Sequence, residues 1–250
     1  MKVGILQPGY IPWLGFFDLI NRSDKFIILD DVQYTVRDWR SRNRIKTPQG
    51  VMWLTVPIQA SNARSRIISD IVIDNTQGWQ LNHIKNLTTF YKKAPFYPEI
   101  IDMINDIYCR QYRYLIDIDM AFIYAICNYM LVGTPIVLSS ELGSTGSKDE
   151  KLLSLCHKVA ATAYISGNAA KSYLRESIFT GKGIEVIWHD YQHPFYNQLW
   201  VKEHGFISYL SAIDLLFNQG RDSLDIISGK LIIDNREKVS VISANDFMKG

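Results

Sequence analysis

Short apolar runs alternate with amphipathic stretches along much of the chain. The runs at residues 3–6 and 26–29 are brief and continuous, as in buried strands, and residues 14–21 between them have helical periodicity. A strand, a loop, a helix and a second strand in this order open a parallel βαβ unit. The same rhythm returns later, with strands expected at 135–138, 163–166 and 184–188 and helices at 149–160, 169–178 and 211–218.

The middle of the chain has a different pattern. Residues 43–46 and 51–57 flank the turn Thr47-Pro48-Gln49-Gly50, which predicts a hairpin. Apolar positions at three- and four-residue steps then predict three helices, at 79–92, 98–108 and 114–131. Further candidates for short strands are residues 71–73, 231–233 and 239–241.

These elements predict an α/β fold with a mainly parallel sheet and helices on both faces, Rossmann-like, plus a helical lobe. A chain of 250 residues fits one large domain. We expect a single α/β domain over residues 1–229, with a helical insertion at about 78–131 and a C-terminal tail at 230–250.

Composition excludes several classes of protein. Lys and Arg total 27 and Asp and Glu total 25, so a net charge of +2 gives no general attraction to nucleic acid. We expect no membrane span, because no run of about 18 apolar residues is present. The first residues lack the charged and apolar regions of a secretion signal, and Cys109, Cys127 and Cys156 lack zinc-ligand spacing. We therefore expect a cytoplasmic protein with reduced cysteines.

A first group of candidate site residues lies on the loop after the first strand and at the start of the next helix. A glycine in the opening turn of a helix costs ~1 kcal/mol relative to alanine, so a close approach by a ligand or another backbone is a reason to keep it. The amides at a helix start also attract anions. The alternative is a tight turn packed by aromatic rings. The group consists of Gln7, Pro8, Tyr10, Pro12, Trp13 and Gly15.

A second group follows the second strand and consists of Asp30, Asp31, Gln33 and Tyr34. Adjacent carboxylates after a buried strand are costly unless they are exposed, paired or used. They suit a sugar hydroxyl, a metal–phosphate unit or an amine, and one of them is a candidate general base. The alternative is a solvated strand end.

A third group is the cation-rich stretch from Arg37 to Lys46, with five cations in ten residues. Arginine forks match phosphate geometry, and a tryptophan stacks on a base or a sugar. This stretch predicts a site for the diphosphate of a nucleotide, with a plain surface cluster as the alternative. Its candidate binding residues are Trp39, Arg40, Arg42, Asn43 and Arg44.

Two later segments also follow predicted strands, where α/β folds place ligands. One contains Ser166, Gly167, Lys171 and Tyr173 as candidate binding residues. The other, His189-Asp190-Tyr191-Gln192-His193, offers His189 and Asp190 as an acid and a base. We expect no metal, because these residues have no third ligand elsewhere in the sequence.

The segments QPGYIPWLGFFDLI, DDVQYTVRDWRSRNRIKTPQG, WLTVPI, YISGNAAKSYL and LSAIDLLFNQG closely resemble the WbqC-like family. The resemblance runs from Lys2 to about Gly220 and so covers most of the chain. It implies a connection with bacterial surface-polysaccharide (O-antigen) gene clusters and with the acyl or aminoacyl decoration of amino sugars.

A more distant similarity is to the nucleotidylyltransferase superfamily, which includes pantothenate synthetase and the class I tRNA synthetases. Its H-x-G-H signature aligns with Trp13-Leu14-Gly15-Phe16. The glycine matches, but aromatic residues replace both histidines and cannot stabilise charge on reacting phosphates. A nucleotidylyltransferase-like fold is therefore implied with adenylate-forming chemistry in doubt.

Our leading interpretation is an acyl- or aminoacyltransferase that acts on a nucleotide-linked amino sugar. Asp30 or Asp31, or else His189 with Asp190, takes the proton from the attacking amine. The alternatives are an ATP-dependent ligase or nucleotidylyltransferase and a non-catalytic protein that binds sugar nucleotides. The sequence leaves open whether ATP or an acyl carrier is the donor, and whether the chain is a homodimer. The three N-terminal groups are expected to converge on one cleft for an anionic small molecule.

Overall fold

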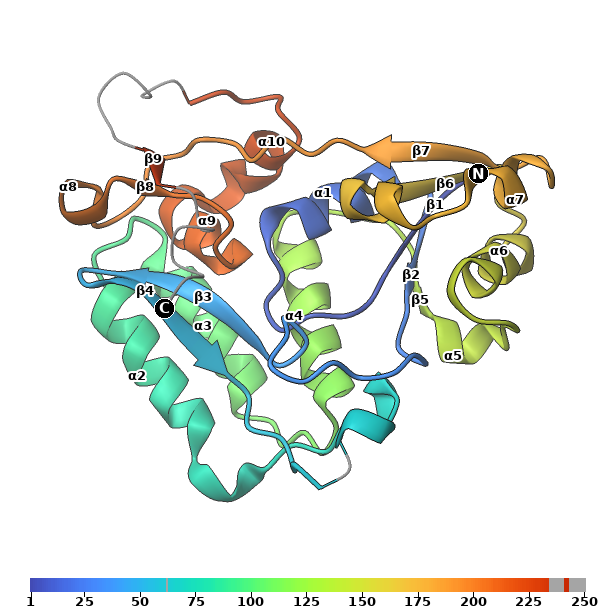
Figure 1. The fold of residues 1–250 in the computed structure, drawn as a ribbon. Helices are drawn as coiled ribbons and strands as arrows, with labels where there is room; N and C mark the ends of the chain where they lie inside the picture. The colour runs from blue at the N-terminus through green and yellow to red at the C-terminus, as the bar shows by residue number, and fades with distance from the viewer. Residues whose placement is uncertain (62, 234–240, 243–250) are drawn as a thin grey trace.

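A five-stranded parallel sheet, in the order β5-β2-β1-β6-β7, organises one end of the molecule (Figure 1). The computed structural model describes residues 1–61, 63–233 and 241–242. The predicted α/β class with a mainly parallel sheet is confirmed, and the first strand of the chain lies at the sheet's centre. The strands are β1 (Lys2–Leu6), β2 (Lys25–Ile28), β5 (Ile136–Leu138), β6 (Ala163–Gly167) and β7 (Glu185–His189).

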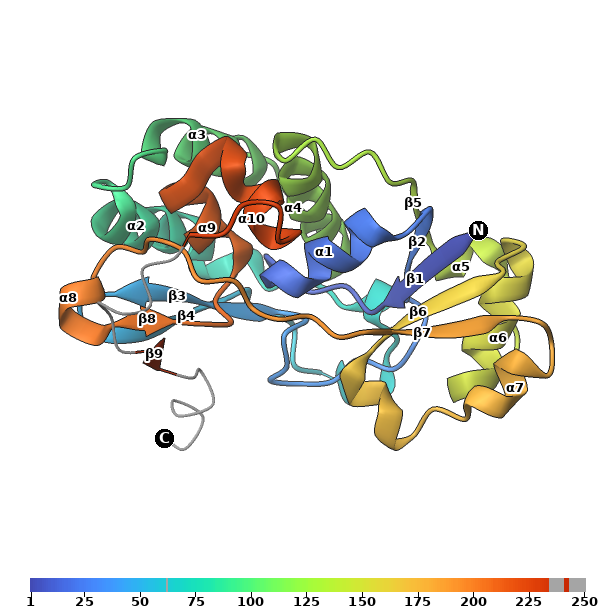
Figure 2. The ribbon, with the colours of Figure 1, turned by 90° about the horizontal axis from the view of Figure 1, so that it is seen from above.

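Helices cover both faces of this sheet (Figure 2). Alternate residues of β2 point to opposite faces, as the two-residue period of a strand requires. Phe26 and Ile28 pack in the larger hydrophobic cluster, whereas Ile27 packs in the smaller one. One face carries α1 (Leu14–Arg22), α4 (Leu115–Tyr129) and α10 (Ser223–Ile227), and the other carries α6 (Lys148–Lys158) and α7 (Glu176–Thr180).

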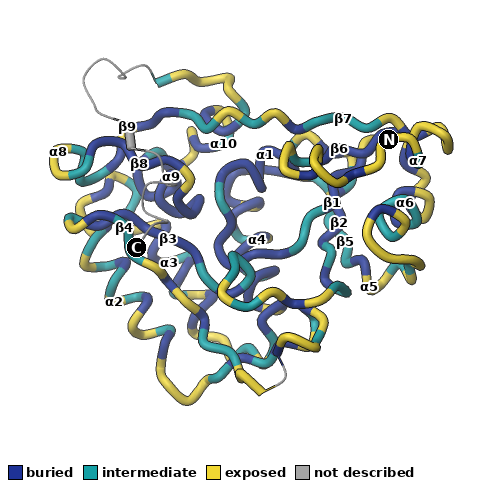
Figure 3. Tube along the Cα trace, in the orientation of Figure 1, coloured by how far each residue is buried: buried dark blue, intermediate teal, exposed yellow. Residues whose placement is uncertain are grey.

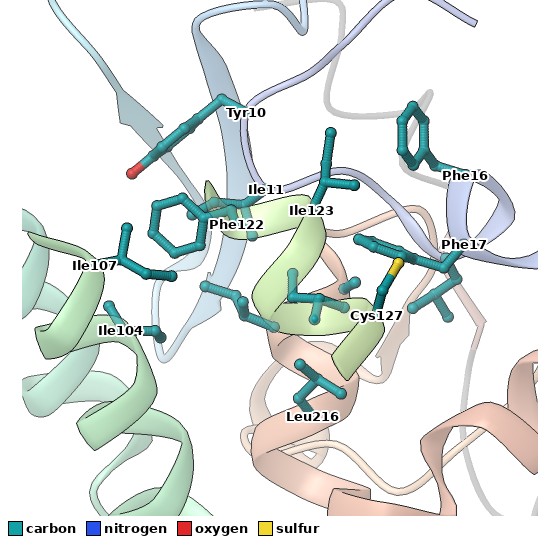
Figure 4. Packing of buried hydrophobic residues seen from close by; sticks show 14 of the residues in the cluster. Tyr10, Ile11, Phe16, Phe17, Ile104, Ile107, Phe122, Ile123, Cys127 and Leu216 are labelled. Carbon is teal, nitrogen blue, oxygen red and sulfur yellow. The ribbon is translucent and has the colours of Figure 1, made fainter. Parts of the chain in front are cut away.

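The other end of the molecule is built on the predicted hairpin, which forms as β3 (Arg42–Thr47) and β4 (Gly50–Thr55). The helices α2 (Trp79–Tyr91), α3 (Tyr97–Tyr108) and α9 (Ala212–Gln219) pack around it. Buried positions run through α1, α4 and β3 (Figure 3). Side chains from α1, α3, α4 and α9 meet in one cluster (Figure 4), so the predicted helical lobe shares its core with the sheet.

Short elements complete the described chain. A two-residue strand, β8 (Phe206–Ile207), pairs with β9 (Val241–Ile242). The short α-helices are α5 (Ser139–Leu142) and α8 (Val201–His204). The 3-10 helices are η1 (Ala63–Ser65), η2 (Ile68–Asp70), η3 (Asn75–Gln77), η4 (Asn168–Ser172) and η5 (Gly220–Asp222). Within the described residues, no helix has the length and apolar character needed to cross a bilayer.

The single helix predicted at 169–178 is wrong, because it is divided into η4 and α7. Arg175 lies between the two pieces, and both its backbone N–H and its side-chain Nε donate to the Asp149 carboxylate, at 3.3 and 3.0 Å. A continuous helix would need that backbone N–H for its own ladder. A contact with a distant residue therefore ends the helix.

The minor strands expected from the sequence are mostly not formed. Residues 72 and 73 make only single-residue bridges, to Tyr114 and Ile58. Residues 231–233 form no strand. Of the run 239–241, only Val241 lies within the described residues, where it begins β9. Much of the predicted tail, 234–240 and 243–250, lies outside the described residues.

The buried His83 makes the stability of this fold depend on pH. Its ring lies beside Tyr10 and Tyr108, and burial lowers its pKa from 6.5 to about 4. As the pH falls below 6.5, His83 becomes protonated in the unfolded chain but stays neutral in the folded chain. The folded state therefore loses stability between pH 6.5 and about pH 4. We expect this linkage to cost about 2 kcal/mol at pH 5.

Urea unfolding at pH 7.5 and pH 5 measures this effect. The loss of stability between the two pH values should be smaller in His83→Gln than in the wild type by that amount. The matched variant His157→Gln, at an exposed position on α6, should keep the wild-type pH dependence. Equal losses in the wild type and His83→Gln would show that His83 does not contribute.

Candidate functional site

The carboxyl ends of the five parallel strands bring most of the predicted site segments to one edge of the sheet. Gln7 follows β1, Asp30 and Asp31 follow β2, and His189 ends β7. The strand order reverses between β1 and β6, because β1 leads to β2 on one side while β6 pairs on the other. Such a switch point is where open α/β sheets bind ligands.

The turn after β1 and the arginine-rich stretch are in direct contact. The Tyr10 amide donates to the Trp39 carbonyl at 3.0 Å, and the Asn43 side chain donates to the Ile11 carbonyl at 2.7 Å. Arg40 Nε donates to Gln7 Oε1 at 2.7 Å, which places a guanidinium beside the end of the central strand. Two of the three predicted groups are therefore joined.

Asp119 of α4 is a buried carboxyl near Arg40 that sequence reasoning missed. It is fully buried, and neither carboxyl oxygen has a hydrogen-bond partner among the described residues. Burial raises the pKa of Asp119 well above its usual range, and the Arg40 charge opposes that rise. Burial also lowers the pKa of Arg40, against the charge of Asp38 at 3.4 Å. Arg40 is thus held by nearby protein groups on several sides.

The adjacent residues Asp30 and Asp31, called the twin acids below, both contact the start of α5. Asp30 is buried and accepts from Ser139 Oγ at 2.9 Å and from the Ser140 amide and hydroxyl at 3.0 and 2.6 Å. Asp31 contacts the Ser139 hydroxyl and forms an ion pair with Lys151 at 2.7 Å. These contacts fix the junction between β5 and α5, which leaves Asp30 poorly placed to take a proton from a substrate.

His189 has a carboxylate partner that the sequence did not reveal. Its Nε2 lies 2.7 Å from Oδ2 of Asp18, a fully buried residue of α1 that also accepts from Arg22 Nε at 2.6 Å. A buried carboxylate fixes the orientation and tautomer of an imidazole. The neighbouring Asp190, which the sequence offered as the partner, accepts instead from Asn168 at 2.6 Å.

A line of aromatic rings and two arginines leads from the hairpin to His189. We call it the aromatic strip. Each member contacts the next one along the strip. Ring centroids, or a guanidinium carbon and a ring centroid, lie 4.2 to 5.6 Å apart. One link is instead a 3.2 Å hydrogen bond from Arg44 to the Tyr209 carbonyl. The strip consists of Arg42, Trp53, Trp39, Arg44, Tyr209, Trp13 and Tyr191, and Tyr191 contacts the His189 ring.

The strip is accessible at two of its rings, because Trp53 is 38% and Tyr209 40% exposed. Half-exposed aromatic rings beside arginines suit a sugar or a base, whose apolar faces they cover while polar groups bind the edges. The sequence had singled out Trp39, Trp13, Arg42 and Arg44. Trp53, Tyr191 and Tyr209 were not among the candidates from the sequence.

Gly15 lies beneath the Trp13 indole. A side-chain carbon at Gly15 would lie 2.2 Å from an atom of that ring. The glycine is therefore needed to make room for the Trp13 side chain, and its presence does not require a ligand. Phe16, the other aromatic of the H-x-G-H alignment, is buried against Phe26.

Several other predicted binding residues lie in the core. Tyr10 is fully buried, packs edge-on against Phe122 (Figure 4) and contacts Tyr108 through its hydroxyl. Pro8, Pro12 and Ser166 are buried as well. Tyr34 is buried and donates to Ser41 at 3.0 Å.

Three of the remaining predicted residues, Gln33, Lys171 and Tyr173, are exposed, and Gly167 is partly buried. Lys171 lies over the Trp188 ring, and Tyr173 is exposed beside it in sequence. Gln33 is exposed and donates to the Arg64 carbonyl at 2.7 Å. Gly167, at the end of β6, is opposite His189 in the ladder with β7. Among the described residues, no three His, Cys, Asp or Glu side chains come together as a metal site.

Comparisons with known proteins agree with the resemblance seen in the sequence. The model of the WbqC-like protein family matches residues 7–226. The chain is also 42% identical, over 228 residues, to the uncharacterized protein Rv1507c of Mycobacterium tuberculosis, and the match covers 90% of this chain and 97% of that protein. No solved structure matches the chain significantly. The chain therefore belongs to the WbqC-like protein family.

Proposed function

We propose that this protein is an acyl- or aminoacyltransferase that modifies the amine of a nucleotide-linked amino sugar in bacterial surface-polysaccharide biosynthesis. The observation that carries the proposal is the buried Asp18–His189 pair, which lies at the carboxyl edge of the sheet and in ring contact with the aromatic strip. A histidine held by a carboxylate is suited to moving a proton. A strip of aromatic rings beside it is suited to holding a sugar.

The proposed reaction uses His189 as the general base. With Asp18 ionised, His189 Nε2 keeps its hydrogen and donates a hydrogen bond to Asp18. Nδ1 is therefore the nitrogen that accepts a proton. The sugar amine attacks the carbonyl carbon of the acyl donor, and the new C–N bond forms as the bond to the donor's leaving atom breaks. The proton lost by nitrogen passes to His189 Nδ1 and then to the leaving group, so His189 returns to its starting state.

The aromatic strip supplies the binding site in this proposal. Tyr209 and Trp53 are 40% and 38% exposed, and Trp13 and Tyr191 continue the strip towards His189. Contacts between the sugar and the strip would hold the sugar amine near the base. Such positioning raises the rate of a transfer between two substrates.

The direct test is to incubate the protein with UDP-linked amino sugars and either an acyl-CoA or ATP plus an amino acid. Mass spectrometry then follows the sugar nucleotide. A product heavier by one acyl group, with release of free CoA, supports the proposal. Release of pyrophosphate from ATP would point instead to a ligase. Tight binding without any product under all donors would point to a sugar-nucleotide-binding protein.

Removing one ring of the strip should weaken binding of the sugar nucleotide. Tyr209→Leu keeps an apolar side chain but loses the ring face, and we expect the Kd for the UDP-linked sugar to rise about 10-fold, as for the loss of one stacked ring. Tyr124→Leu is the matched control, because Tyr124 is 46% exposed on α4 and makes no contact with the strip in the described structure. Equal affinities for both variants in calorimetry would remove the strip from the proposed site.

A further inference from the structure

An open cleft of about 840 Å³ lies between the loop that follows β2 and the segment that follows β4. Three arginines line it: Arg37 from the loop that follows β2, Arg42 from the start of β3, and Arg64 from η1. Neutral polar side chains, including Gln33, Ser41 and Thr55, lie between them. The cleft therefore combines positive charge with additional hydrogen-bonding groups.

No acidic side chain among the described residues lines this positively charged cleft. Arg37 and Arg64 are exposed, and within the described part of the chain neither side chain has an acidic partner. Three like charges around one hollow repel each other, and an anion placed between them removes that repulsion.

The arginines stand on a backbone that is held in place. Arg42 donates from its guanidinium to the Arg37 carbonyl, and Gln33 donates to the Arg64 carbonyl at 2.7 Å. Arg37 has a φ of +57°, a left-handed conformation that is costly for a residue with a side chain and persists only where the surroundings enforce it. Positioned arginines lose less freedom when they bind than arginines on a free loop would.

The cleft also meets the aromatic strip. The Arg42 guanidinium lines the cleft and lies 4.2 Å from the centroid of the Trp53 ring. By contrast, Arg40 is bound to Gln7 and Asp38, and the Arg44 guanidinium lies against both Trp39 and Trp53. Of the arginines expected to hold a diphosphate, Arg42 is the one that lines this cleft.

We propose that this cleft is a binding site for the diphosphate of a nucleotide, with Arg37, Arg42 and Arg64 as its cationic ligands. The base or sugar then lies on Trp53 and the strip. The identity of the ligand as a nucleotide-linked sugar rests on the proposed function, whereas the anion site itself does not. Arginine forks, which can each bind two phosphate oxygens, fit a diphosphate better than a single carboxylate.

Isothermal titration with inorganic pyrophosphate and with UDP tests the site without any transfer assay. We expect the wild type to bind both, and Arg37→Gln/Arg64→Gln to bind both at least about 10-fold more weakly. The control Arg110→Gln/Arg113→Gln removes two exposed arginines outside the cleft and should keep the wild-type affinities. Both double variants change exposed side chains, so their melting temperatures should stay close to that of the wild type.

The outcomes separate this inference from the proposed function. Absence of pyrophosphate and UDP binding at millimolar concentration, or an equal loss of affinity in both double variants, would overturn the cleft as a diphosphate site. Acyl transfer could still occur in that case, with the phosphates bound elsewhere. Selective loss of pyrophosphate binding in Arg37→Gln/Arg64→Gln would support the cleft, even if no acylated sugar is ever detected.

Discussion

Replacing His189 with Gln should lower the rate of acyl transfer by about 10²–10⁴-fold, the usual contribution of a general base. Glutamine keeps hydrogen-bonding groups at this position but cannot accept a proton at neutral pH. Steady-state kinetics should show the loss mainly in kcat, because the aromatic strip, which is the proposed sugar-binding site, is unchanged. His157→Gln, which removes an exposed histidine from α6, should retain full activity.

Asp18 should act on the same step as a positioning residue. Asp18→Asn keeps the size of the side chain but loses the charge that fixes the His189 tautomer, so we expect kcat to fall while KM changes little. A variant of either residue with unchanged kcat would refute the role of His189 as the base. Asp31→Asn would then be the next variant to examine, since Asp31 is the less buried of the twin acids.

Replacing Asp214 with Ala should cost about 3–5 kcal/mol of stability, as for the loss of one partner from a buried charged network. The Asp214 carboxylate is buried and accepts from Tyr91 Oη at 2.6 Å, Tyr196 Oη at 2.8 Å and Gln198 Nε2 at 2.9 Å. Lys46 lies in the same network, donating to Gln198 Oε1 at 3.0 Å. Alanine would leave these buried donors without their acceptor.

Urea unfolding of three variants separates the contributions in this network. Asp214→Asn keeps one acceptor but not the charge, and should fall between the wild type and Asp214→Ala. Asp222→Ala, at an exposed position in η5, should change stability by less than about 1 kcal/mol. If Asp214→Ala lost no more stability than that control, the network would not contribute to the stability of the fold.

Burial lowers the pKa of Lys46 to about 8, and the Asp214 charge opposes this shift. Lys46 should therefore lose its proton more readily in Asp214→Ala.

Local patterns in the sequence were sufficient to predict the main elements. The five strands of the sheet, the hairpin and the helices near 79–92, 98–108 and 114–131 all form within a few residues of the expected bounds. The sheet strands and these helices have an apolar run or a helical period that tertiary contacts do not override, and the hairpin is marked by its turn at Thr47–Gly50. The helix expected at 169–178 failed for the opposite reason, because Asp149 captures the backbone of Arg175 from a separate helix.

The residues of the candidate site were harder to predict from the sequence, because its main contacts join distant parts of the chain. Asp18 is the single acid of α1, and only the packing of that helix against the end of β7 identifies it as the partner of His189. Likewise, Trp53 and Tyr209 look like ordinary aromatic residues until the hairpin and the segment before α9 meet. The one signal that sequence reasoning could have used is the buried acid within Leu14–Arg22.

The central position of β1 has a consequence for how the chain reaches its native state. On one side β1 pairs with β2, which follows closely, but on the other it pairs with β6, at Ala163–Gly167. Likewise, β2 ends at Ile28, whereas its outer neighbour β5 begins at Ile136. A ribosome must therefore synthesise the chain as far as Ala163–Gly167 before β1 can pair with its second neighbour. Until β5 is synthesised the nascent β1–β2 pair has two open edges, and the free edge of β1 stays open until β6 follows, so this topology favours slow folding with strand edges exposed.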